Sequence, residues 1–157
     1  MYKEIFLFIN PLNEKSLEFE KKVMSKIDIS KTHIRFIPII NLRIVHNYLK
    51  YHPNIHNLNE KNKIFQAVYD EILAFNAAAF QGAKKARNFL MNVQEKIFFK
   101  NKKLSSEIII ESAYEVNLDI KLFKKDWHSN LAKKSFLNDL QLANEMHIRQ
   151  TSITAVE

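Results

Sequence analysis

Several residue types on which protein chemistry often depends are missing or scarce in this sequence. It has no cysteine, one glycine and three prolines in 157 residues. A chain without cysteine forms no disulfide, offers no thiolate nucleophile or thiolate metal ligand, and cannot exchange thiols with a disulfide. One glycine is too few for a glycine-rich phosphate loop. We also find no Ser-His-Asp order and no paired carboxylates. These absences exclude thiol chemistry and glycine-rich phosphate binding, and we expect no cofactor.

Long apolar runs and targeting signals are also absent. No stretch approaches the roughly 18 uninterrupted apolar residues of a membrane span. The N-terminus lacks a positive region, an apolar block and a cleavage site in series. We therefore expect a cytoplasmic protein with no membrane partner. Because 46% of the residues are apolar, we expect one domain over residues 1–157 with a single core.

The formal charge of +7 raises the question of a nucleic-acid partner. The basic residues are scattered along the chain, alternate with acidic ones and lack an aromatic nucleic-acid signature. A nucleic-acid partner is therefore disfavoured, and a solvated face or an acidic protein partner is preferred. The basic clusters are Lys21 and Lys22; Lys84, Lys85 and Arg87; Lys102 and Lys103; Lys124 and Lys125; Lys133 and Lys134.

The first 40 residues predict a strand, a helix and a second strand. Residues 3–9 hold an unbroken apolar run that is typical of a strand covered on both faces. Phe19, Val23 and Ile27 recur at helical spacing and predict the inward face of the helix. Residues 33–40 predict the second strand, and Pro38, which cannot donate to a ladder, places it at an edge.

Residues 59–147 then follow a helical pattern with one glycine and no proline. Gly82 is placed where a left-handed residue would end the first long helix, whereas Ser105 and Asp119 look like helix N-caps. The last helix is interrupted near residues 127–130. Residues 150–157 are β-branched enough for a returning strand. We expect a sheet in the order second, first, third strand, with an insertion of four or five helices before the third strand.

This plan, together with the turn after the first strand, resembles the DsbA-type thioredoxin fold, an α/β fold with an all-helical insertion. In that family the turn leads into a Cys-x-x-Cys motif, which the sequence Asn13-Glu14-Lys15-Ser16 would replace. A cis-proline loop follows the insertion, and Thr151 and Ser152 stand there, with Ser152 in place of the proline. The resemblance implies a thioredoxin fold that has lost its redox chemistry.

Within this superfamily the sequence most resembles the Gram-positive adaptor family that presents the regulator Spx to the ClpXP protease. The likeness rests on residues 10–16, 77–90 and 142–150. It implies a redox-inactive adaptor that binds a protein partner, an Spx-like regulator or ClpXP, at a degenerate site formed by Asn13, Glu14, Lys15, Ser16, Thr151 and Ser152.

Two further hypotheses concern the same residues. Asn13 suits the N-cap of the first helix, with Glu14 favourable in its first turn, and contact with a partner peptide is compatible with that role. The alternative is a glutathione-linked or DsbA-like thiol-disulfide enzyme, in which Asn13 would polarise a sulfur. Thiol-free relatives that use glutathione place serine at this position, which argues against that alternative.

Other residues favour structural roles. His46, His52 and His56 cluster in sequence, but Pro53 interrupts the helical face that would aim two of them at one metal, so a loop of unpaired histidines and no metal site are expected. Arg87 beside two phenylalanines suits either a recognition residue or a side chain that snorkels over an apolar face.

The sequence departs from the thioredoxin plan in length. The fold needs a fourth strand and a closing helix after the third strand, and Glu157 comes first. Either the chain is a fragment or divergent product, or another chain completes the sheet. An uncovered edge at residues 151–156 would suit strand addition, including pairing with a second copy.

Overall fold

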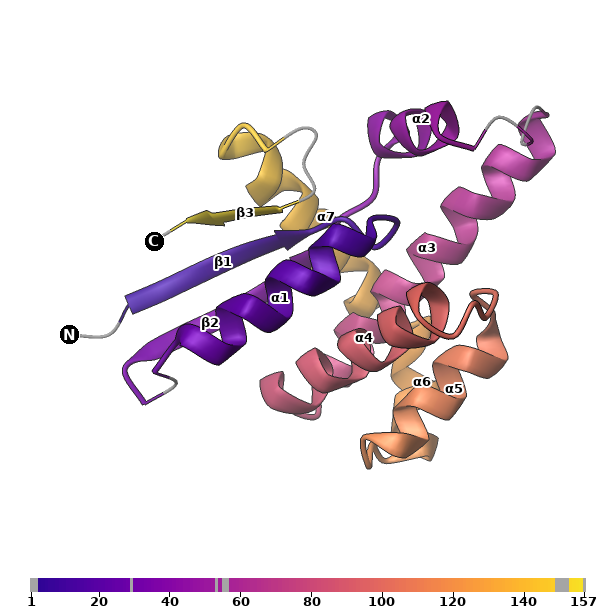
Figure 1. The fold of residues 1–157 in the computed structure, drawn as a ribbon. Helices are drawn as coiled ribbons and strands as arrows, with labels where there is room; N and C mark the ends of the chain where they lie inside the picture. The colour runs from indigo at the N-terminus through magenta and orange to yellow at the C-terminus, as the bar shows by residue number, and fades with distance from the viewer. Residues whose placement is uncertain (1–2, 29, 53, 55–56, 149–152, 157) are drawn as a thin grey trace.

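The computed structural model describes residues 3–28, 30–52, 54, 57–148 and 153–156, and for Lys3 and the last four of these residues it describes the backbone only. The elements, shown in Figure 1, are β1 (Lys3–Ile9), α1 (Glu14–Lys26), β2 (Thr32–Pro38), α2 (Leu42–Lys50), α3 (Leu58–Ala79), α4 (Ala83–Phe98), α5 (Ser106–Glu115), α6 (Ile120–Trp127), α7 (Asn130–Glu145) and β3 (Ile153–Val156).

The three strands form one sheet in the order β2-β1-β3, as the sequence predicted. β1 pairs in parallel with β2 and antiparallel with β3. Pro38 ends β2 opposite Ile9 on an edge strand, where its missing N–H costs no ladder bond. β2 is shorter than the predicted range 33–40, because the chain leaves the sheet after Pro38. β3 is the other edge, and its pairing with a second chain stays a prediction.

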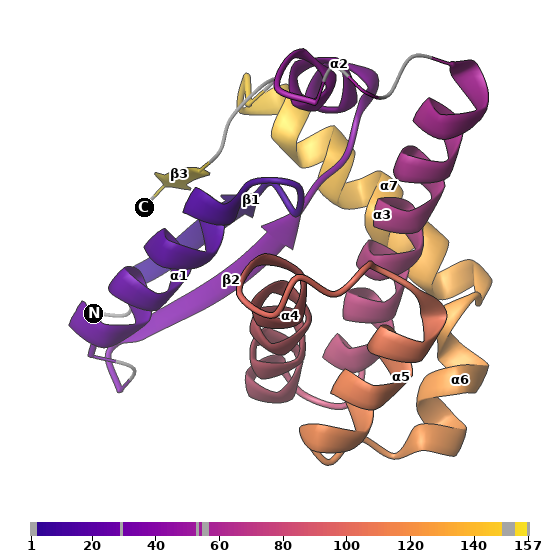
Figure 2. The same cartoon turned by 45° about the vertical axis from the view of Figure 1, so that its right-hand side comes forward.

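α1 lies across one side of the sheet, while α7 passes behind it (Figures 1 and 2). The predicted inward face of α1 is wrong in part. Phe19 is 37% exposed, whereas Ser16, Leu17 and Glu20 are fully buried. A periodicity argument follows apolar side chains and therefore missed a buried face that contains a serine and a glutamate.

The helices α3 to α6 stand to one side of the sheet, and α7 returns beside it (Figure 2). α3 is the central element of this insertion, because it packs against α4, α6 and α7. The prediction missed α2. This short helix is capped by Asn41, whose Oδ1 accepts from the N–H of Ile44 at 2.8 Å. It contains His46, so the expected loop of histidines is wrong for that residue, and His56 lies outside the described residues.

With one glycine available, the helices end on other residues. Asn117 and His147 take left-handed conformations, with φ of 61° and 60°, after α5 and α7. In both places the next N–H bonds back to a carbonyl in the last helical turn, which satisfies a carbonyl at the helix end. Gly82 has φ of 130° and precedes α4 as its N-cap, so its predicted role as the left-handed end of α3 is wrong. Ser105 and Asp119 are N-caps, as predicted.

No helix in the described ranges is long and apolar enough to cross a bilayer.

Replacing one aromatic side chain tests the packing of the insertion's core. Phe123 of α6 is fully buried, with ring centroids 5.7 Å from Phe89 and 5.6 Å from Trp127. Phe123→Ala should lower the free energy of unfolding by about 3–5 kcal/mol, because it removes an aromatic ring and leaves a cavity. The adjacent Leu122 is 41% exposed, and Leu122→Ala should cost less than about 1 kcal/mol. Urea unfolding measures both, and equal losses would contradict this packing.

Candidate functional site

The turn between β1 and α1 is held by its own polar groups. The Oδ1 of Asn10 accepts from the N–H of Leu12 at 3.0 Å, and the carbonyl of Asn10 accepts from the N–H of Asn13 at 3.0 Å. The Oδ1 of Asn13 accepts from the N–H of Lys15 at 2.9 Å. The N-cap prediction for Asn13 is therefore confirmed. These bonds occupy the side-chain oxygens of both asparagines in holding the backbone.

The second cysteine-like position is different in kind from the first. Ser16 is fully buried, and its Oγ accepts from the N–H of Asn10 at 3.4 Å. Asn13 is half-buried, while Glu14 and Lys15 are exposed. Of the predicted motif, residues 13–15 therefore present a surface, whereas Ser16 ties the helix to the turn.

The other predicted site residues, Thr151 and Ser152, lie outside the described residues. The strand that follows them is described. Ile153 pairs with Ile9 at the carboxyl end of β1, directly before the turn. This register brings β3 back to the end of the sheet at which the predicted motif begins.

A groove of about 490 Å³ opens beside the turn. Pro11 and Leu12 of the turn line one part of it, and the rest is lined by the first half of α3, the end of α4, the α4–α5 connection and Tyr48 of α2. Its apolar lining includes Leu12, Ile64, Val68, Ile97, Phe98 and Leu104. The groove can therefore receive apolar side chains directly next to the surface of residues 13–15.

The polar residues of this groove carry an excess of positive charge. Lys63, Lys102 and Lys103 line it, against the single carboxylate of Glu60. Lys102 lies 4.0 Å from the carboxylate of Glu111. Within the described residues, Lys63 and Lys103 have no acidic partner. An apolar floor with unpaired lysines at its rim favours an acidic segment with apolar side chains.

Behind the turn lies a buried polar cluster that the sequence did not reveal. Glu20 of α1 and Glu71 of α3 are both fully buried. The Oε2 of Glu20 accepts from the Nε2 of Gln94 on α4 at 2.9 Å. Among the described residues, neither oxygen of Glu71 has a hydrogen-bond partner. The two acids are 51 positions apart in the sequence, and the charge of Glu20 acts on the carboxyl of Glu71.

Burial raises the pKa of both carboxyls from the ordinary 4.5 to about 8. For Glu20 the hydrogen bond from Gln94 and the charge of Lys21 oppose this rise, and for Glu71 the charge of Glu20 adds to it. Both acids are therefore mainly protonated at neutral pH, since a buried ionised carboxylate without a cation is costly. One signal was available in the sequence: Glu71 opens the stretch 71–79, in which Asn76 is the only other polar residue.

The histidines that the structure describes do not assemble into a ligand set. The ring of His52 stacks on Tyr48 at 3.8 Å, and its Nδ1 lies 2.8 Å from the carbonyl of Tyr48. In the part of the chain that the structure describes, no group of three His, Cys, Asp or Glu side chains could hold a metal ion.

Comparison with known proteins assigns the chain to a family. Residues 6–156 match the family model described as Thioredoxin. The match covers nearly the whole chain, so the chain belongs to this thioredoxin family. The sheet order, the turn and the helical insertion agree with the DsbA-type plan.

Within this family the chain is similar to proteins named ClpXP adapter protein SpxH. The SpxH of Bacillus cereus is 43% identical over 79 residues, which are 50% of this chain and 27% of that protein. The SpxH of Staphylococcus haemolyticus is 30% identical over 148 residues, which are 94% of this chain and 52% of that protein. The predicted resemblance to this branch is confirmed. The chain spans about half or less of the length of these relatives.

A solved structure supports the fold independently. The cytosolic disulfide reductase DsbM from Pseudomonas aeruginosa with GSH matches with a TM-score of 0.65 at 10% identity, over 98% of this chain and 89% of that chain. At this identity the likeness concerns the fold alone.

The buried acid pair predicts a pH-dependent stability. Each acid keeps its proton to about pH 8 in the folded state and loses it near 4.5 when unfolded. The folded state therefore binds more protons between these values, and stability falls as the pH rises, by about 1 kcal/mol per pH unit for each group. Glu71→Gln cannot ionise at this position. Its free energy of unfolding should therefore increase relative to that of the wild type as the pH rises from about 5 to 8.

Urea unfolding across this pH range measures the effect. Glu18→Gln on the exposed side of α1 is the matched control and should keep the wild-type slope. Parallel profiles for the wild type and Glu71→Gln would show that Glu71 is not held protonated.

Proposed function

We propose that this chain is a noncatalytic, protein-binding adaptor domain that holds a partner segment at the surface of residues 13–15 and the adjoining groove. The groove beside the turn carries this proposal. In place of the cysteines stand Asn13, which caps a helix, and Ser16, which is buried. The position that would carry redox chemistry thus serves structure, while the apolar groove next to it stays open.

The names of the relatives suggest which partner this domain would bind. Proteins similar to this chain over 94% of its length are named ClpXP adapters. The partner we propose is an Spx-like regulator, delivered to the ClpXP protease. Because the described chain covers about half of such relatives, the proposal concerns the contribution of this domain to that delivery.

The chemistry of the groove specifies the segment that it would hold. Lys63 and Lys103 would attract carboxylates, and the apolar lining would bury side chains between them. Apolar burial provides most of the affinity in such a groove, while the charges raise the association rate and select the partner. The segment is therefore acidic with apolar side chains at intervals.

The glutathione-linked alternative is less well supported. It needs a polar group that is free to polarise a bound sulfur. The Oδ1 of Asn13 accepts from the N–H of Lys15, which leaves the Nδ2 amide of Asn13 as the donor for a sulfur, and the hydroxyl of Ser16 is fully buried. A thiol bound at the turn would therefore face residues 13–15 without access to Ser16.

The test is the affinity of purified Spx for the chain under reducing conditions, measured by isothermal titration calorimetry. Lys63→Glu/Lys103→Glu should weaken binding by about tenfold or more, because two attractive contacts become repulsive. Both lysines are exposed, so folding should not change.

Lys133→Glu/Lys134→Glu on the exposed side of α7 is the matched control and should bind as the wild type does. Equal weakening by the two pairs would indicate net charge instead of a site. Binding of glutathione, lost in Asn13→Ala, together with no affinity for Spx, would favour the enzyme alternative.

A further inference from the structure

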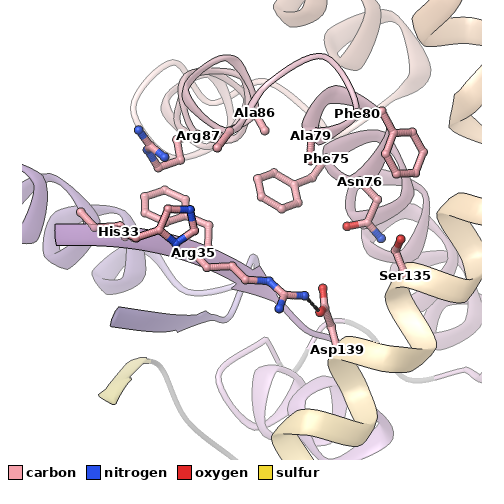
Figure 3. A pocket seen from close by; sticks show the side chains of 13 residues that line it. His33, Arg35, Phe75, Asn76, Ala79, Phe80, Ala86, Arg87, Ser135 and Asp139 are labelled. Carbon is pink, nitrogen blue, oxygen red and sulfur yellow. Dashed lines mark hydrogen bonds and ion pairs between the residues drawn. The ribbon is translucent and has the colours of Figure 1, made fainter. Parts of the chain in front are cut away.

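A second pocket lies on the opposite half of α3 from the groove, between β2, α3, α4 and α7 (Figure 3). It has a volume of about 150 Å³. Figure 3 shows Arg35 of β2 reaching Asp139 of α7 on one side, with Arg87 of α4 on the other. The pocket shares no residue with the groove or with residues 13–15.

The two arginines of this pocket are unequally satisfied. One terminal nitrogen of Arg35 donates a hydrogen bond to the Oδ1 of Asp139. The guanidinium group has five N–H donors, so this bond uses only one of them. Arg87 is half-buried, and no described residue pairs with its guanidinium. Burial lowers the pKa of Arg87. Partial desolvation without a counter-charge is unfavourable, so this arginine lacks the anion that would compensate it.

The charge pattern of α4 adds to this mismatch. Its first turn contains no acidic residue and holds Lys84 and Lys85, and Arg87 follows at the start of the second turn. Cations are unfavourable at the positive end of a helix dipole. Lys85 donates to the carbonyl of Asn117 at 3.2 Å, but Arg87 has no such bond among the described residues. The guanidinium of Arg87 is therefore left without a counter-charge among the described residues, in a basic stretch of the helix.

The pocket already contains one example of the ligand that it suits. The carboxylate of Asp139 bonds to Arg35 from within the chain, although burial raises its pKa. A planar carboxylate matches the fork of a guanidinium group. Phe75, Ala79 and Phe80 add an apolar wall next to these charges, and Phe80 is 40% exposed.

We propose that this pocket is a second protein-binding site, which takes carboxylate side chains from an acidic peptide segment, one on Arg87 and one on Arg35, with an adjacent apolar side chain against Phe80. The inference goes beyond the function proposed for the groove, and neither site needs the other. If both are correct, the domain can hold two segments at the two halves of α3.

The test is a titration of the ¹⁵N-labelled chain with a short glutamate-rich peptide that ends in phenylalanine, followed through the amide resonances of residues 33–36 and 83–87. Arg87→Gln should raise the dissociation constant of the peptide, as measured from these resonances, by about tenfold, because a hydrogen bond between charged groups is lost. Lys84→Gln removes the same charge one turn away, does not line the pocket, and should change it less than about twofold.

Asp139→Asn is a second variant, and its expected effect on peptide affinity is the opposite of that of Arg87→Gln. It removes the internal carboxylate that competes for Arg35, so the peptide should bind more tightly, which a merely unfolded variant could not do. Thermal melting confirms that each variant is folded. The proposal is overturned if Arg87→Gln binds like the wild type, if Lys84→Gln loses as much affinity, or if a single-stranded oligonucleotide binds these residues more tightly than the peptide. Loss of Spx binding by groove variants would leave this result unchanged.

Discussion

The burial of β1 on both sides is the constraint on which the rest of the structure depends. Leu7, Phe8 and Ile9 are completely inaccessible, and β1 has a neighbouring strand on each edge. A strand covered in this way must leave the core at its carboxyl end, and the chain there can only turn. Asn10 and Asn13 hold that turn with their side chains, and Pro11 and Leu12 of the turn line the groove directly before residues 13–15.

α3 connects the groove with the buried acids and with the arginine pocket. Its first half lines the groove, its middle contributes the buried Glu71, and its last turns line the arginine pocket. Glu20 and Glu71 are buried in this part of the molecule with pKa values raised to about 8, because burying their ionised carboxylates would be too costly.

The parts of the fold that followed from sequence were those set by strong local signals. The apolar run of β1 and the position of Pro38 were enough for the strand order. The inward face of α1 was not predictable, because Ser16 and Glu20 are buried by partners on other elements while Phe19 is exposed. For the site, the capping role of Asn13 is a local property, whereas the groove, the acid pair and the arginine pocket each need contacts between distant segments.

The most direct test of the central claim is hydrogen exchange of the chain with and without purified Spx under reducing conditions. If the degenerate turn and its groove form the binding surface, Spx should slow exchange in residues 10–18, 60–68 and 97–104, which enclose the groove. Protection confined to α6 and the exposed side of α7, with unchanged exchange in those three segments, would contradict the account.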